Sequence, residues 1–115
     1  MKKKNKTIIG LTEEVQLFSA NGRSKTLIAK VDTGASRSSL DINLASELNL
    51  GPIIKSKMIK SAHGNRLRPI IEAELKIAGK KIKSEFTLAD RAHMKYGMLI
   101  GVNILKHDFL VDPSK

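Results

Sequence analysis

The chain has 115 residues, of which 41% are apolar, and it contains no cysteine. This length indicates one domain with a modest core, and the lack of cysteine excludes disulfides and thiolate metal sites. The formal net charge is +10, and only 3% of the residues are aromatic. A basic surface can bind nucleic acid, attract acidic peptides or keep a protein soluble, and the scarcity of aromatic stacking platforms argues against nucleic acid.

The chain begins with a basic segment, Met1–Lys6, which we interpret as a solvated tail ahead of a single domain over residues 7–115. The apolar run behind this tail is too short for the hydrophobic region of a signal peptide. No apolar run approaches the roughly 20 residues that span a membrane. We therefore expect a cytoplasmic protein without a membrane partner.

The first third of the chain predicts three short strands, over residues 7–11, 15–18 and 26–31. The pair Asn21-Gly22 is typical of a tight hairpin turn, so the second and third strands should pair, with Glu13-Glu14 near the preceding turn. In the third strand, alternation predicts one face made of Leu27, Ala29 and Val31.

The most distinctive stretch is the hexapeptide Val31-Asp32-Thr33-Gly34-Ala35-Ser36. An apolar strand runs directly into a carboxylate, a hydroxyl and a glycine. Glycine permits a positive φ angle and close backbone approach, and the Thr33 hydroxyl can bind neighbouring backbone groups. Such a turn presents an acid at a site, but a plain Asp-Thr-Gly turn is also common in β-proteins, so the tripeptide alone leaves both interpretations open.

Behind this loop, Asp41 is a good N-cap for a short helix over 42–48, which Gly51-Pro52 should end. Strand-like segments over 57–60 and 67–77 flank a polar turn and predict a long hairpin. The later segments predict a strand over 82–88, a loop over 90–97, a buried strand over 98–100, a short helix over 101–106 and a last strand over 109–111. We predict an all-β chain that forms a closed or sandwiched barrel with one or two short helices.

Three motifs, in this order, closely resemble the retropepsins, the single-domain aspartic proteases of retroviral type. Val31–Ser36 resembles their catalytic loop, Lys57–Pro69 resembles their flap with Ser61–Asn65 at its tip, and Ile100–Leu105 resembles the strand and helix that support the loop. The chain resembles still more closely a bacterial and archaeal RimB-like branch that carries the name ATP-dependent zinc protease. The segments similar to that branch are Ser61–Gly64, Leu67–Ile71, Thr87–Arg91, Met98–Gly101 and Phe109–Pro113.

The resemblance implies a retropepsin-like closed β-barrel with a flap hairpin, and the activity of a homodimeric aspartic endopeptidase. Asp32 of each copy would form a dyad that activates a water, Thr33 would hold the two loops together, and Gly34 would line the cleft. Substrate-binding positions implied by the same motifs are Ala35, Ser36, Ala62, His63 and Gly64. The substrate would be a peptide or protein, and the cationic surface suggests acidic peptides, as does the branch's association with glutamate-adding ATP-grasp ligases.

Two positions depart from the retroviral pattern. Where retroviral members place an acid after Asp-Thr-Gly-Ala and an Arg within Gly-Arg-Asn, this chain has Ser36 and Val102. Both members of that ion pair are absent together, so no buried charge is left unpaired. A dimer of this chain must therefore be held in a different way.

The residues do not support the ATP and zinc parts of the branch's name. A Gly-rich phosphate loop followed by Lys-Ser or Lys-Thr is missing, and so is a His-Glu-x-x-His motif. The three histidines, His63, His93 and His107, are scattered over separate segments. We expect no cofactor and no metal. The alternative left open is a catalytically silent dimeric β-barrel that binds an acidic partner or a ribosomal or RNA partner.

Overall fold

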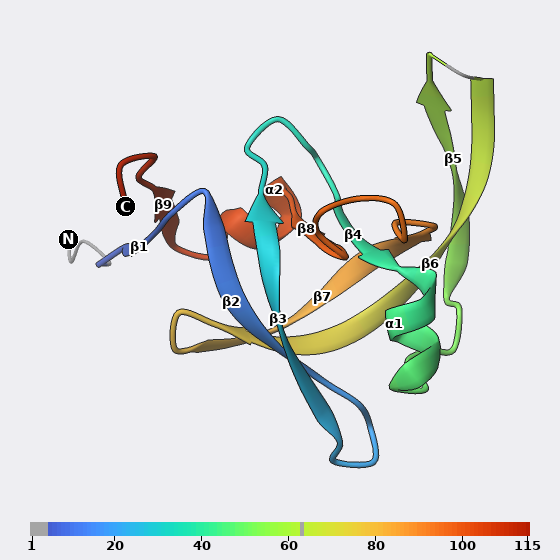
Figure 1. Ribbon diagram of the computed structural model, residues 1–115, viewed down its shortest axis with the longest axis horizontal. Helices are drawn as coiled ribbons and strands as arrows, with labels where there is room; N and C mark the ends of the chain where they lie inside the picture. Colours follow the sequence, from blue (N-terminus) through green and yellow to red (C-terminus); the bar gives the residue numbers. More distant parts are fainter. Residues whose placement is uncertain (1–4, 63) are drawn as a thin grey trace, which may run out of the picture.

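The computed structural model describes residues 5–62 and 64–115. Figure 1 shows a β-rich chain with a hairpin that projects from its main body. The strands and helices follow one another as β1 (Thr7–Ile9), β2 (Thr12–Phe18), β3 (Ser24–Val31), β4 (Ser38–Asp41), α1 (Ile42–Glu47), β5 (Lys55–Ser61), β6 (Gly64–Ile77), β7 (Lys80–Ala89), β8 (Met98–Ile100), α2 (Val102–Leu105) and β9 (Phe109–Val111).

Six strands close into a barrel in the order β2-β3-β8-β4-β7-β6, because β6 also pairs with β2. The β2–β3 hairpin has the expected antiparallel pairing, with Phe18 opposite Ser24 across the Asn21-Gly22 turn. β8 lies between β3 and β4, so the strand after the last long loop lies next to the strand that leads into the Asp32 loop. The predicted closed β-barrel with two short helices is confirmed.

The core follows from strand alternation. In β6, Ile71, Ala73, Leu75 and Ile77 are buried, and the residues between them face outward. In β3, Ala29 and Val31 are buried and Leu27 packs against the core, as the alternation predicts. Burying each large aliphatic side chain contributes about 1.5–3 kcal/mol.

β6 belongs to two parts of the molecule. Its second half, Ile70–Ile77, pairs with β7 in the barrel, and its first half pairs with β5 from Gly64 onward. The β5–β6 hairpin therefore leaves the barrel as an arm (Figure 1). Within the described residues β5 pairs with β6 alone, so its outer edge is open.

The chain ends meet in a separate two-stranded parallel sheet of β1 and β9, with Ile8 opposite Leu110. The Lys115 ammonium donates a hydrogen bond to the Ile8 carbonyl at 2.6 Å, so the C-terminal turn folds back on β1. Among the described residues, no helix has the length and apolar character needed to cross a membrane.

Three local details differ from what the sequence predicts. β2 begins earlier than predicted, so Glu13 and Glu14 lie at its start, directly after the β1–β2 connection, where the Glu13 carboxylate accepts a hydrogen bond from the Gly10 backbone N–H at 2.8 Å. β4 was not predicted, because the sequence Ser-Ser has no apolar alternation. Asp41 occupies the N-cap position of α1 but makes no capping hydrogen bond, since its buried carboxylate accepts the Arg91 backbone N–H at 2.9 Å.

Candidate active site

Asp32 lies where β3 leaves the barrel, and the backbone on both sides of it is fixed. The Val31 N–H donates to the Leu11 carbonyl, and the Asp32 N–H donates to the Ile100 carbonyl, each at 2.9 Å. Because β8 supplies Ile100, the last buried strand holds the start of the loop in place. The Asp32 side chain itself is partly exposed.

Within the loop, the Asp32 carboxylate has a defined orientation. Its Oδ1 accepts the Gly34 backbone N–H at 2.9 Å, and the Asp32 carbonyl accepts the Ala35 N–H at 3.2 Å. Gly34 does not adopt a positive φ angle, which corrects one reason given for a glycine here. Glycine suits this position because a Cβ here would lie 3.3 Å from Asp32 Oδ1, which is tight contact.

α2 and β8 support the loop from behind. The Val102 N–H donates to the Ala35 carbonyl at 2.8 Å. A Cβ on Gly101 would lie 2.8 Å from that same carbonyl oxygen and closer still to the Arg37 carbonyl, so only glycine fits. The backbone of the loop therefore rests directly on the backbone at the start of α2.

A buried network of polar side chains surrounds this support. The Ser38 hydroxyl accepts the Gly101 N–H at 2.9 Å and donates to Asn103 Oδ1 at 2.8 Å. The Asn103 amide nitrogen donates to the Ser84 hydroxyl and to the Glu85 carbonyl, each at 3.0 Å. These contacts tie β4, β7 and α2 together beneath the loop.

Beside the loop lies a cavity of about 470 Å³, which we call the loop cavity. The loop, the stem of the β5–β6 hairpin and the segment after β7 all contribute to its wall. Its lining residues are Gly34, Ala35, Ser36, Arg37, Ser39, Ile59, Arg68, Thr87, Ala89, Asp90, Arg91, Met94 and Leu99. The lining combines an apolar part with three arginines and one aspartate.

Arg91 is the best-anchored cation of this cavity. Its Nε donates to the Tyr96 carbonyl at 3.0 Å, and its backbone N–H is held by Asp41. Burial lowers the pKa of the Arg91 guanidinium, the negative charge of Asp41 raises it, and the positive charge of Arg68 lowers it again, so that the pKa lies below its ordinary value. The electric field of Arg68 therefore reaches Arg91.

The hairpin brings further positive charge to the same side. Residues 55–70 contain no acidic residue. Arg68 lies opposite Lys57, and Arg66 lies opposite Ile59, so these four side chains share one face of the hairpin. Ile59 and Arg68 line the loop cavity, which identifies this face as the one turned toward the Asp32 loop.

The predicted site residues fall into two groups. Asp32, Thr33, Gly34, Ala35 and Ser36 form one loop, and the last three line the loop cavity. Ala62 and Gly64 are exposed at the hairpin tip, away from the residues that line the cavity, and the predicted position His63 lies outside the described residues.

Sequence reasoning missed Ile59, Arg68 and Arg91 as residues of this cavity. On its own residues, Asp90-Arg91 is more typical of local structure than of a substrate contact, although the RimB-like resemblance extends over Leu67–Ile71 and Thr87–Arg91 and so leaves some functional weight on it. A further signal was the basic, acid-free composition of the hairpin, and no local pattern links Arg68 to Arg91.

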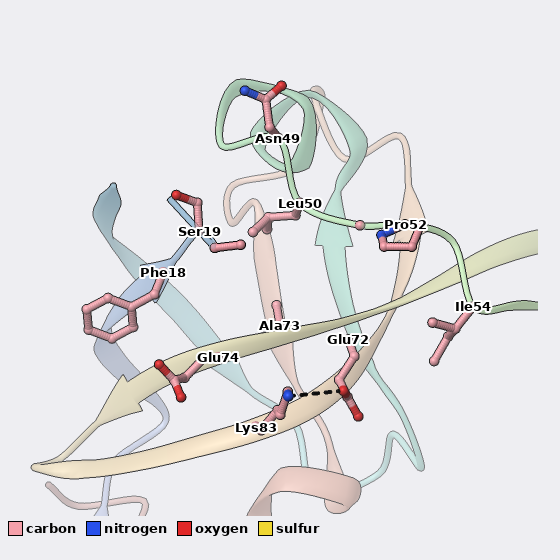
Figure 2. Close-up of a pocket in the computed structure, with 12 residues that line it drawn as sticks. Phe18, Ser19, Asn49, Leu50, Pro52, Ile54, Glu72, Ala73, Glu74 and Lys83 are labelled. Carbon is pink, nitrogen blue, oxygen red and sulfur yellow. Dashed lines mark ion pairs between the residues drawn. The ribbon is translucent and has the colours of Figure 1, made fainter. Parts of the chain in front are cut away.

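Two other cavities border further parts of the molecule. One, of about 430 Å³, lies between the β2–β3 turn, the segment after α1 and the outer side of β6, and Figure 2 shows the Glu72–Lys83 ion pair (3.6 Å) at its edge. The other, of about 490 Å³, is polar and lies beside α2. At its wall, Glu85 is 3.7 Å from Arg37 and 3.3 Å from Lys55, so it links the segment after the loop to the base of the hairpin. Ser36 of the Asp32 loop also lines this second cavity, whereas no sequence motif predicts a function for the first.

Comparison with protein families gives one match. Residues 43–115 match the RimB-like family, described as retropepsin-like aspartic endopeptidase RimB. The matched segment begins after the Asp32 loop and includes the hairpin, β8 and α2. No curated protein is similar enough to the chain to count as a match.

Solved structures share the fold over most of the chain. The protein Lpg0085 of unknown function from Legionella pneumophila is 23% identical, with a TM-score of 0.66 and 95% of each chain covered. The protease of simian foamy virus is 18% identical, with a TM-score of 0.61, and the match covers 83% of this chain and 91% of that one. The EIAV protease in complex with the inhibitor HBY-793 is 25% identical, with a TM-score of 0.65, and the match covers 83% of this chain and 84% of that one.

Proposed function

The chain belongs to the RimB-like family of retropepsin-like aspartic endopeptidases, and from this premise we propose that it is a homodimeric aspartic endopeptidase acting on acidic peptides. One observation carries the proposal. A partly exposed aspartate, within an Asp-Thr-Gly loop fixed by β8 and α2, stands beside a cavity that opens between the loop and a projecting hairpin.

The proposed chemistry needs two carboxylates close enough to share one proton, because two like charges about 3 Å apart do not both ionise. Each chain supplies one Asp-Thr-Gly loop. A second copy, related by a two-fold axis, would bring its own Asp32 to the same point. One carboxylate would then accept a proton from a water, and the other would donate its proton to the carbonyl oxygen of the scissile peptide bond.

Each loop residue has a role in this proposal. The Gly34 N–H holds one oxygen of Asp32, and the small Gly34 leaves room beside the carboxylate. Thr33 is exposed and would contact the partner's loop across the axis. The β5–β6 hairpin would act as a flap that closes over an extended peptide and excludes water from the reacting bond.

Charge supports an acidic substrate. The net charge is +10, and the cavity beside the loop is lined by Arg37, Arg68 and Arg91 against the single acid Asp90. Complementary charge steers a substrate toward the site and selects among substrates.

The deciding experiment compares wild type with Asp32→Asn on a peptide library that includes acidic sequences, at pH values from about 4 to 8. The control variant is Glu14→Gln, which removes an exposed carboxylate in β2. We expect wild type and Glu14→Gln to cleave, and Asp32→Asn to be inactive although it stays folded and dimeric in sedimentation. Inhibition of wild type by a statine-type transition-state analogue should accompany this.

Two outcomes would contradict the proposal. Cleavage that survives Asp32→Asn would place the activity elsewhere or in a contaminant. A folded dimer that cleaves no peptide and binds no statine peptide would instead favour a silent binding barrel.

A further inference from the structure

Two arginines from different parts of the molecule line the same cavity. Arg91 belongs to the segment between β7 and β8, which is part of the barrel body. Arg68 belongs to the part of β6 that pairs with β5, so it is part of the projecting hairpin. The loop cavity is therefore bounded by two cations of the barrel body, Arg37 and Arg91, and by Arg68 of the hairpin. Of the two body cations, Arg37 already lies 3.7 Å from the Glu85 carboxylate.

Neither Arg68 nor Arg91 is neutralised at its outer end. The Nε of Arg91 is bound to the Tyr96 carbonyl, whereas its two Nη groups have no acceptor among residues 5–62 and 64–115. Arg68 has no ion-pair partner in the same part of the chain. A guanidinium offers a planar fork of donors that suits a carboxylate.

The acids near this pair make no ion pair with either guanidinium in the described part of the chain. Asp41 accepts the Arg91 backbone N–H, and its negative charge raises the pKa of the Arg91 guanidinium. Asp90 accepts the Ala92 N–H at 3.1 Å, and Glu85 lies beside Arg37 and Lys55. The positive charge of Arg68 lowers the pKa of Arg91, so the two guanidiniums repel each other. Bringing the hairpin closer to the loop without an anion between them raises this repulsion.

We propose that Arg68 and Arg91 together bind one carboxylate side chain of the substrate, and that this shared anion draws the β5–β6 hairpin down onto the Asp32 loop. This inference rests on the proposed function and adds two specificity-determining residues and a closing mechanism to it. The apolar part of the cavity, with Ile59, Met94 and Leu99, would pack against the aliphatic stem of the same side chain. An acid at one substrate position would then favour closure as well as binding, so it would raise kcat and not only lower KM.

The first test uses peptide pairs that differ by Glu against Gln at one position, scanned along the peptide. Wild type should prefer Glu at one position by roughly 10- to 100-fold, the range of a doubly charged hydrogen-bonded contact. Arg68→Gln and Arg91→Gln should each abolish most of this preference. The double variant should be no worse than either single variant, because both arginines hold the same carboxylate.

The matched control is Arg66→Gln. Arg66 lies two positions from Arg68 on the same strand and the same hairpin face, but it does not line the cavity. It should keep the Glu preference. If Arg66→Gln loses the Glu preference to the same extent, the preference comes from general surface charge and the proposal is wrong. Arg91→Gln could also disturb the segment that Arg91 holds through the Tyr96 carbonyl. In that case Arg68→Gln alone still tests the proposal, because the Arg68 side chain makes no such contact in the described residues.

The second test measures closure of the β5–β6 hairpin in a variant that cannot cleave the peptide. The chain has no cysteine, so Asn65→Cys can carry a single environment-sensitive dye near the hairpin tip, in an Asp32→Asn background. The Glu peptide should change the dye signal and the Gln peptide should not, and Arg91→Gln should remove the response. Equal responses to both peptides would refute closure by a shared anion.

The two proposals fail separately. If the Glu peptide closes the hairpin of Asp32→Asn but wild type cleaves no peptide, the proposed protease activity is wrong and the proposed binding of a carboxylate by Arg68 and Arg91 stands. If wild type cleaves Glu and Gln peptides at equal rates at every position, the protease activity stands and the proposed binding of a carboxylate by Arg68 and Arg91 is wrong.

Discussion

At the scale of single residues, two glycines set the shape of the site because other atoms approach them closely. Gly34 lies against the Asp32 carboxylate, and Gly101 lies against the carbonyls of Ala35 and Arg37. The Asp-Thr-Gly motif is continuous in sequence, so its place at a strand end could be predicted from the chain alone. The role of Gly101 could not, because the carbonyls that exclude a side chain there belong to a segment that is distant in sequence.

The two glycines should separate stability from activity. Gly101→Ala should destabilise the fold by about 3 kcal/mol, the upper end of overpacking costs, since its Cβ would meet backbone atoms that cannot move aside. Gly34→Ala should change the unfolding free energy by less than about 1 kcal/mol but lower kcat/KM by roughly 10- to 100-fold, since its Cβ crowds the carboxylate. Urea unfolding and peptide cleavage measure both quantities. A Gly101→Ala variant as stable as wild type would contradict the packing argument.

At the scale of elements, the sequence predicted those with a strong periodic pattern. β3, β8 and the second half of β6 carry alternating or continuous apolar residues, and all were expected. β4 was missed because its burial depends on partners far away in the chain. Ser38 is fully buried and forms hydrogen bonds with Gly101 and Asn103, which no local pattern contains. Arg68 and Arg91 were missed as a pair for the same reason.

The Asn103 network should stabilise the junction of β4, β7 and α2. Asn103→Ala removes the acceptor of the Ser38 hydroxyl and the donor to Ser84, so unfolding should become easier by about 1–3 kcal/mol. Asn65→Ala, at an exposed hairpin position, is the control and should have little effect. If the two variants unfold at the same urea concentration, the network does not hold this junction.

At the scale of the whole molecule, two exposed apolar side chains lie next to the Asp32 loop and two more face outward from the terminal sheet. Leu11 and Val102 neighbour the loop through the hydrogen bonds to Val31 and Ala35, and Ile8 and Leu110 face outward from the terminal sheet. These four side chains are 42–52% exposed. Val102 stands where the retroviral pattern has a charged residue, so an apolar contact would replace the ion pair in the dimer that we propose.

Val102→Glu should weaken that dimer by roughly 10-fold or more, because it would bury an unpaired charge at the contact. Sedimentation should show dissociation, and cleavage should fall at low protein concentration and return at high concentration. Ile28→Glu changes an equally exposed residue of β3, 48% accessible, and should leave the dimer intact. Unchanged sedimentation of Val102→Glu would place the contact on another face.

The open edge of β5 has a consequence for solubility. An unpaired strand edge is a template for uncontrolled pairing between molecules, and lysines along such an edge prevent it. β5 carries Lys55, Lys57 and Lys60, so charges that favour an acidic substrate also keep neighbouring molecules apart. Selection for a neutral substrate could therefore not simply remove them, since each lost lysine would bring the exposed strand closer to aggregation. Part of the positive charge that would steer an acidic peptide to the site thus also limits aggregation through this edge, whereas the proposed contact with a substrate carboxylate belongs to Arg68 and Arg91.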